Sequence, residues 1–348
     1  MMQKLTFHKR FIQLNWITLI CIYLVVIAGS FVRISGSGMG CPDWPKCFGQ
    51  WVPPTSDKNL PPDYKDIYSQ KREKKIIRFA NFLEKIGFEK EANQLRNDKS
   101  LLVEQDFNGR KTWTEYINRL FGVLAGMGVL FVFLLVLFKY RTKKLVFWST
   151  SNLIILCIQA WFGSIVVATN LVPWTITVHM LLALLIIAIQ ILIIYQISDK
   201  KKNPLNLNMS MKIIIWLAFL ITFVQMFLGT QVRESIDQLN IQGFGREMWT
   251  EKLGLAFFIH RSFSWLVLII LVLLSWMNYK GGKSKLIYLS FVVLVLELLS
   301  GVLLAYTEMP GLVQTSHLFF ASVLFGTLFY TILKIERLPT VLPSAVKD

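Results

Sequence analysis

Eight long apolar runs constrain the fold of this chain more than any other feature. They lie at roughly 11–32, 113–138, 145–168, 174–197, 211–232, 251–277, 285–306 and 312–333. Each is about 20 residues or longer, which is the length that an α-helix needs to cross the hydrocarbon core of a bilayer. Backbone groups in hydrocarbon must be paired within the segment, so such runs fold as helices. The sequence therefore predicts an all-α integral membrane protein with eight transmembrane helices.

Basic residues predict the orientation of these helices. They precede the first run and follow the second, fourth and sixth, the last three groups being Lys139, Arg141, Lys143 and Lys144, then Lys200, Lys201 and Lys202, then Lys280, Lys283 and Lys285. By the positive-inside rule these ends, and both the N- and C-termini, are cytoplasmic. The same placement accounts for the net charge of +16. We therefore expect membrane lipid as a partner, no nucleic acid, and a multi-pass location in the bacterial cytoplasmic (inner) membrane.

The long loop at about 33–112 is then extracytoplasmic, and its lysines are no contradiction because long loops are exempt from the charge rule. Residues 64–102 place apolar side chains at approximately helical spacing among Lys and Glu. This pattern predicts one or two amphipathic helices lying on the bundle, with binding of a partner as the alternative.

The chain also repeats itself. Gly29–Arg33 at the end of the first run matches Gly229–Arg233 at the end of the fifth, and Tyr116–Arg119 matches Phe258–Arg261. In the same order, Gly163, Pro173 and His179 recur as Gly301, Pro310 and His317. An even number of runs separates the copies, so both insert with the same orientation. The repeat predicts two pseudo-symmetric four-helix bundles, residues 1–200 and 201–348, each with a pocket near the extracytoplasmic surface.

Three of the four histidines fall in the outer part of a predicted span, namely His179, His260 and His317. His260 and His317 belong to one half at similar depth, and two facing imidazoles are what a six-coordinate haem iron requires. The alternative is that each histidine hydrogen-bonds a neighbouring helix. Zinc or copper would need further ligands, and the sequence offers no evident cluster of them.

The N-terminal half carries two changes from this arrangement. Asn118 stands where the repeat has His260, and Glu115 stands where it has Phe257. Asn is a poor haem ligand, so this half offers His179 alone to a bound iron. Glu115 lies one turn before Asn118 on the same face, where a carboxyl group is suited to proton transfer. The alternative is a carboxylate that merely favours a helix N-terminus. The sequence predicts an electron-transfer haem in one half and a reacting site in the other.

Other polar residues near the outer ends have two interpretations each. Four arginines depart from the positive-inside bias and fit either haem propionates or interfacial snorkelling, namely Arg33, Arg119, Arg233 and Arg261. Gln159 and Glu297 occupy equivalent positions and fit either a proton path or a helix–helix hydrogen bond. Cys41 and Cys47 lie on the oxidising side of the predicted topology and fit either a structural disulfide or a thiol relay.

Together these residues resemble the heme A synthase family over nearly the whole chain. The resemblance is carried by the repeated halves, Val32–Cys41, Glu115–Arg119, His179, His260-Arg261 and His317-Leu318. It implies an oxidoreductase that converts the C8 methyl of haem O, through a hydroxymethyl stage, to the formyl group of haem A for cytochrome oxidase biogenesis.

The resemblance also implies roles for individual residues. His260 and His317 hold a haem b cofactor, the N-terminal half takes haem O with Glu115 close to the reaction, and the pair Cys41 and Cys47 assists redox chemistry or assembly. The implied partners are the substrate haem O, a heme O synthase, an electron acceptor and a second copy of the chain.

Two features depart from the family pattern. The family has histidine where this chain has Asn118, so either His179 alone holds the substrate or the N-terminal half no longer reacts. The retained Glu115 and cysteine pair favour the first alternative. The loop at 57–110 is also longer than the family plan, and the sequence assigns it no role.

Two rival functions remain from the residues alone. A haem b electron-transfer protein would need the His260 and His317 site but not Glu115. A haem-handling assembly protein or transporter would fit parallel repeats, although sites at helix ends rather than at the midplane argue against transport.

Overall fold

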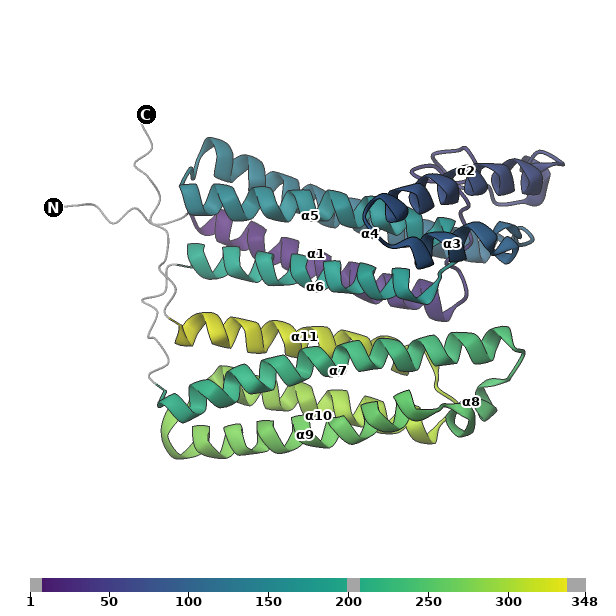
Figure 1. Ribbon diagram of the computed structural model, residues 1–348. Coiled ribbons are helices and arrows are strands. Elements are labelled where there is room, and N and C mark those ends of the chain that lie inside the picture. The colour runs from purple at the N-terminus through teal and green to yellow at the C-terminus, as the bar shows by residue number, and fades with distance from the viewer. Residues whose placement is uncertain (1–7, 199–206, 337–348) are drawn as a thin grey trace. The chain divides into compact units, whose positions relative to one another are not determined.

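The computed structural model describes residues 8–198 and 207–336, whose regular secondary structure is helical, with no strand. Within them, eight helices are long and apolar enough to cross a membrane, which confirms the prediction. They are α1 (Lys9–Ile34), α4 (Gly109–Phe138), α5 (Lys143–Ala168), α6 (Pro173–Ile197), α7 (Met209–Ile241), α9 (Leu255–Met277), α10 (Lys285–Tyr306) and α11 (Gly311–Ile335) (Figure 1). The basic group Lys200–Lys202, and the boundary placed at residue 200, lie outside the described residues.

Two helix ends differ from the apolar runs that predicted them. Helix α7 continues to Ile241, well beyond the apolar run that ends near 232, because its last turns are amphipathic rather than polar throughout. Arg233 pairs with Asp237 one turn later at 2.8 Å, and Ile236 is buried beside Trp249 of α8 (Arg246–Lys252). The sixth run was predicted from 251, but α8 ends at Lys252 and α9 begins separately at Leu255.

The sequence predicts one or two amphipathic helices in the long first loop, and the structure has two, α2 (Tyr64–Lys85) and α3 (Glu89–Asn97). The tight turn between them places Gly87 at φ +91°, where a residue with a side chain would be strained. Their buried apolar residues form one core cluster with residues of α5 and α6, which confirms that these helices lie on the bundle. The cluster includes Ile76, Phe79, Leu83, Ala92, Leu95, Phe162, Ile165 and Val166.

A buried ion pair fixes the return of this loop toward α4. The guanidinium of Arg72 on α2 lies 2.8 Å from the carboxylate of Glu104 and donates to the carbonyl of Leu101 at 3.1 Å. Burial raises the pKa of the Glu104 carboxyl, and the charge of Arg72 opposes that rise. Breaking such a pair leaves a buried charge uncompensated, so both partners are needed together.

The chain divides into two compact units. The disulfide unit comprises Ala28–Leu124 and Ile154–Ala183, and the histidine-pair unit comprises Met1–Ile27, Ala125–Leu153 and Leu184–Asp348. In the histidine-pair unit, α7 packs beside α9 and α11, and α10 packs beside α9 and α11 (Figure 1). Their core consists of aliphatic residues such as Ile215, Leu271, Leu294 and Leu328.

A fully buried amide network joins α1, α5 and α6 within the same unit. Asn152 donates to the side-chain oxygen of Gln190 at 3.0 Å, and Gln190 donates to Asn15 at 3.1 Å. All three residues are 1% exposed or less. Polar groups in a membrane interior must be paired, so this network fixes how the three helices face one another.

Candidate functional site

A disulfide-closed loop lies over the first turns of α4. Cys41 and Cys47 are bonded, as the structural-disulfide alternative predicts. The loop backbone touches α4 at Gly40, where an added Cβ would stand 2.6 Å from the carbonyl carbon of Lys111. Thr112 donates to the Gly40 carbonyl at 2.8 Å. Only glycine allows so close an approach of two backbones, so Gly40 lets the disulfide-closed loop pack against the start of α4.

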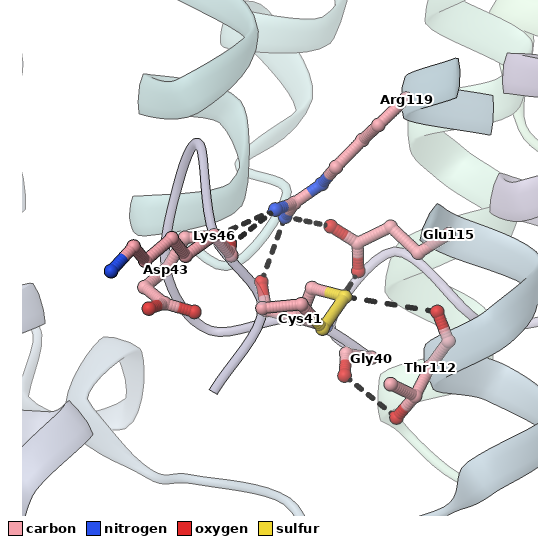
Figure 2. A network of polar contacts seen from close by, with 8 residues as sticks. Gly40, Cys41, Asp43, Lys46, Thr112, Glu115 and Arg119 are labelled. Atoms are coloured by element: carbon pink, nitrogen blue, oxygen red, sulfur yellow. Dashed lines mark hydrogen bonds and ion pairs between the residues drawn. A yellow bond between two sulfur atoms is a disulfide. The ribbon is translucent and has the colours of Figure 1, made fainter. Parts of the chain in front are cut away.

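Glu115 is the buried acid beneath this loop. Glu115 is 3% exposed, and its carboxylate accepts a hydrogen bond from the backbone amide of Cys41 at 2.9 Å. On its other side the carboxylate forms an ion pair with Arg119, one turn later on α4. Figure 2 shows Glu115 between the Cys41 backbone and the Arg119 guanidinium. The sequence predicted that Glu115 lies on the same face as Asn118 and is suited to proton transfer, and in the structure its carboxylate is engaged by the loop and Arg119.

Arg119 holds the disulfide loop through backbone carbonyls. Its guanidinium donates to the carbonyls of Cys41 at 3.0 Å, Asp43 at 2.6 Å and Lys46 at 3.0 Å (Figure 2). The planar fork of an arginine can serve several acceptors at once, which a lysine cannot do with the same geometry. Sequence reasoning offered haem propionates or snorkelling for this residue and missed the loop carbonyls, because they belong to a segment more than 70 residues away.

His179 lies on α6 against α5. A Cβ added at Gly163 of α5 would stand 3.1 Å from the imidazole, so the glycine lets the ring lie against the helix backbone. Gln159 of α5 donates to the backbone carbonyl of His179 at 3.0 Å, which is the helix–helix bond that one alternative predicted for it. The ring nitrogen Nδ1 of His179 is buried and has no hydrogen-bond partner among the described residues.

Asn118 lies on α4 against α1. A Cβ added at Gly29 of α1 would stand 3.8 Å from the Asn118 side-chain oxygen. That oxygen is buried and is without a hydrogen-bond partner in the described part of the chain. Arg33 lies in the last turn of α1, one turn beyond Gly29. An orphaned buried acceptor is costly, and it marks a place where a missing group would supply a donor.

His260 of α9 and His317 of α11 face each other in the histidine-pair unit. Their ring centres are 6.3 Å apart, and the ring planes are nearly perpendicular at 82°. Nδ1 of His317 lies 3.0 Å from the Ser300 hydroxyl and 3.1 Å from the Glu297 carbonyl. With Nδ1 engaged in this way, Nε2 of His317 is the nitrogen left to bind a metal.

Glycines flank these two rings as well. A Cβ added at Gly229 would stand 3.3 Å from the His260 ring, and one added at Gly301 would stand 3.1 Å from the His317 ring. Gln225 donates to the His260 carbonyl at 2.7 Å. The sequence repeat contained all four glycines, at 29, 163, 229 and 301, but gave them no role. Gln225 was missed altogether, although its position one turn before Gly229 could have drawn attention to it.

The two arginines of this half are already engaged. Arg233 donates to the side-chain oxygen of Gln314 at 2.5 Å in addition to its ion pair with Asp237. Arg261 donates to the Tyr306 hydroxyl at 3.2 Å and lies over the same ring. Across residues 8–198 and 207–336 there is no group of three or more His, Cys, Asp or Glu side chains placed to hold a metal ion.

Comparisons with known proteins place these residues in context. The family described as cytochrome oxidase assembly protein (COX15-CtaA) matches residues 13–329. A protein named heme A synthase from Wolbachia pipientis subsp. Culex pipiens is 23% identical over 345 residues, which cover 90% of this chain and 95% of the relative. Another protein of that name, from Wolbachia sp. subsp. Brugia malayi, is 25% identical over 336 residues, which cover 88% of this chain and 91% of the relative. A third, from Shewanella oneidensis, is 27% identical over 175 residues, and that match spans 49% of this chain and 41% of the relative.

Proposed function

The chain belongs to the family of cytochrome oxidase assembly proteins of the COX15-CtaA type, and we propose from this premise that it is a heme A synthase. In this proposal it oxidises the C8 methyl of haem O to a formyl group through a hydroxymethyl stage. The observation that carries it is the family match over residues 13–329, joined to a pair of facing imidazoles in one half and a buried acid in the other.

We propose that His260 and His317 hold haem b. Their ring centres lie 6.3 Å apart, so the two imidazoles leave space between them in which a haem iron could be held. Haem b bound there would carry electrons away from the reaction. The chain contributes a fixed ring orientation, through Ser300 on His317, and Arg233 and Arg261 as candidate partners for propionates.

We propose that the N-terminal half binds haem O through His179. The Nδ1 atoms of His179 and His260 are buried and have no partner in the described residues, so Nδ1 of neither ring makes the helix–helix hydrogen bond that is the alternative to a haem ligand. Asn118 would leave the second axial position of the substrate iron open or hold a water there through its orphaned oxygen. Arg119 and Arg33 complete the set of residues assigned to this pocket.

Glu115 would accept protons that the oxidation releases. Its carboxylate is held on one side by the Cys41 amide and on the other by Arg119, so its position is fixed before substrate arrives. Fixed geometry favours proton transfer because little reorganisation is needed. Arg119 acts here as a positioning residue that ties the acid to the disulfide loop.

We propose that both termini are cytoplasmic and that the sites lie toward the extracytoplasmic side of a bacterial inner membrane. The Cys41–Cys47 disulfide supports this orientation, because disulfides persist in oxidising compartments. We further propose that residues 1–200 and 201–348 are pseudo-symmetric halves. Support comes from four equivalent contacts, in which a glycine lies against Asn118, His179, His260 or His317. A heme O synthase, an electron acceptor and a second copy of the chain are proposed partners.

The test is to express the chain in a bacterium that makes haem O but no haem A, and to separate the extracted haems by chromatography with mass detection. We expect haem A or its hydroxymethyl precursor from the natural chain, and neither from Glu115→Gln, while the haem b spectrum of that variant is retained. Glu73→Gln, at an exposed position of α2, is the matched control and should make product normally. Haem b alone, with haem O unchanged by the natural chain, would contradict the proposal.

The second candidate is a haem b electron-transfer or haem-handling assembly protein without catalysis. The observation that favours it is the complete imidazole pair in one half combined with Asn118 in the other. In that case Glu115→Gln would change nothing, and the same experiment separates the two functions.

A further inference from the structure

The loop helices α2 and α3 carry an exposed apolar surface that the proposed function does not use. Phe82 and Ile86 follow each other by one turn at the end of α2, and Phe88 lies in the turn that leads into α3. These residues are 46%, 50% and 52% exposed. Trp161 of α5, which is 45% exposed, contacts Phe82 ring to ring at 6.0 Å between centres. We call these four residues the Phe82 patch.

Helix α2 packs along the sides of α5 and α6, below the ends of these two spans. Trp161 lies seven residues before the end of α5 at Ala168, or about 10 Å along the helix axis. Leu182 of α6, which packs against the same core cluster as α2, lies nine residues after the start of α6, or about 14 Å inside it. The end of α2 therefore lies beside a residue well within α5 rather than above its end, and the cluster that α2 joins reaches similarly far into α6.

The length of α5 sets where Trp161 stands in a bilayer. A helix of 26 residues is about 39 Å long, roughly 9 Å more than the hydrocarbon core of about 30 Å. If the excess is shared between both ends, Trp161 lies about 6 Å inside the outer boundary of the hydrocarbon core. Interfacial amphipathic helices bury their apolar faces about 5–10 Å into the boundary between headgroups and acyl chains, so this depth suits an interfacial segment. Phe82, in contact with Trp161, lies at the same level.

The patch is also continuous with the membrane-facing surface of α5. Phe147, Ile154 and Ile158 are exposed along the same helix as Trp161, although they are large apolar residues. In a transmembrane helix such residues face lipid rather than water. Lipid at this level would cover Phe82, Ile86 and Phe88, which would otherwise stand in water, where a patch of four large apolar side chains is unfavourable.

We infer that the end of α2 and the turn into α3 are embedded in the outer interface of the bilayer, with the Phe82 patch in contact with lipid acyl chains. The long loop is then a membrane-inserted element that covers the outer part of the α5–α6 hairpin, where His179 lies. This inference is independent of the proposed catalytic function.

The test places a fluorophore on the patch. Cys21 and Cys157, the two free cysteines, are first replaced by alanine, and the bonded pair Cys41–Cys47 does not react with the label. Single cysteines are introduced as Ile86→Cys and Phe88→Cys, and each is labelled with an environment-sensitive dye such as NBD. The matched control is Lys74→Cys, which is exposed and lies about 200° around α2 from the buried Ile76.

The labelled full-length chain is reconstituted into vesicles of phosphatidylethanolamine and phosphatidylglycerol with or without a doxyl-labelled lipid. We expect doxyl lipid to quench the dye at 86 and 88 at least about twofold more than at 74, and iodide in the buffer to show the reverse order. Equal iodide quenching at all three positions would overturn the inference. Protection from both quenchers at 86 and 88 would also overturn it, because a protein partner such as a second copy would then cover the patch.

Discussion

At the scale of single residues, glycines decide how closely His179, His260 and His317 approach the neighbouring helices. Each of three glycines lies against an imidazole ring, namely Gly163, Gly229 and Gly301. A Cβ added at any of them would stand 3.1–3.3 Å from the nearest ring atom. These distances are shorter than ordinary van der Waals contact, so a larger residue must displace the ring. The glycines therefore determine where the imidazole rings can lie.

A direct prediction concerns Gly229→Val. The new side chain would meet the His260 ring and turn it away from His317, so we expect loss of most of the bound haem b absorbance in the purified protein. Gly122→Val on α4 is the control, since nothing lies within 4 Å of a Cβ added there. Retention of full haem absorbance by Gly229→Val would show that His260 does not hold the haem in this orientation.

A second prediction at this scale concerns Arg119→Gln. The change leaves the carbonyls of Cys41, Asp43 and Lys46 without their charged donor, and bonds to a charged donor contribute about 1.5–3 kcal/mol each at most. We expect the loop to open more often and the disulfide to be reduced by dithiothreitol several times faster, as measured by thiol alkylation and mass. Arg110→Gln, at an exposed position nearby, should leave the rate unchanged.

At the scale of elements, paired polar groups rather than hydrophobicity fix how the spans face each other. Leu and Ile side chains are as compatible with lipid as with a neighbouring helix, so apolar contact alone selects no particular face. The amides of Asn15, Asn152 and Gln190 select one arrangement of α1, α5 and α6. Gln159 and Gln225 do the same for the helix pairs that carry His179 and His260.

Replacing Gln190 by leucine tests this view. The change removes the three hydrogen bonds that Gln190 makes with Asn15 and Asn152, and we expect destabilisation of about 1–2 kcal/mol. Thermal unfolding in detergent should show a midpoint lower by a few degrees. Gln13→Leu makes the same chemical change at an exposed position of α1 and should have little effect. Equal midpoints for the two variants would mean that the network does not stabilise the fold.

At the scale of the whole molecule, the proposed orientation determines which compartment each site meets. The disulfide loop, Glu115 and the two haem sites are proposed to lie toward the oxidising side, and the basic loops toward the cytoplasm. We expect green fluorescent protein fused after Asp348 to fluoresce and alkaline phosphatase fused there to be inactive. Alkaline phosphatase fused after Asp106, between α3 and α4, should be active. The opposite result at both positions would reverse the topology.

The sequence by itself determined the number and type of the spans, the presence of amphipathic helix in the long loop and the residues that we propose carry the chemistry. These features depend on local periodicity, on run length and on the recurrence of short motifs, all of which can be read along one stretch of chain. The histidines, Glu115 and the cysteine pair were therefore found without coordinates.

Only the tertiary structure decided what these residues contact. Arg119 meets carbonyls of a loop more than 70 positions earlier, Gly229 meets a ring on another helix, and α2 packs deep along the α5–α6 hairpin. The end of α7 also lies beyond its apolar run, because an amphipathic turn has no hydropathy signal. Such contacts depend on the shape and packing of segments far apart in the chain, and a linear pattern of residue types carries no record of them.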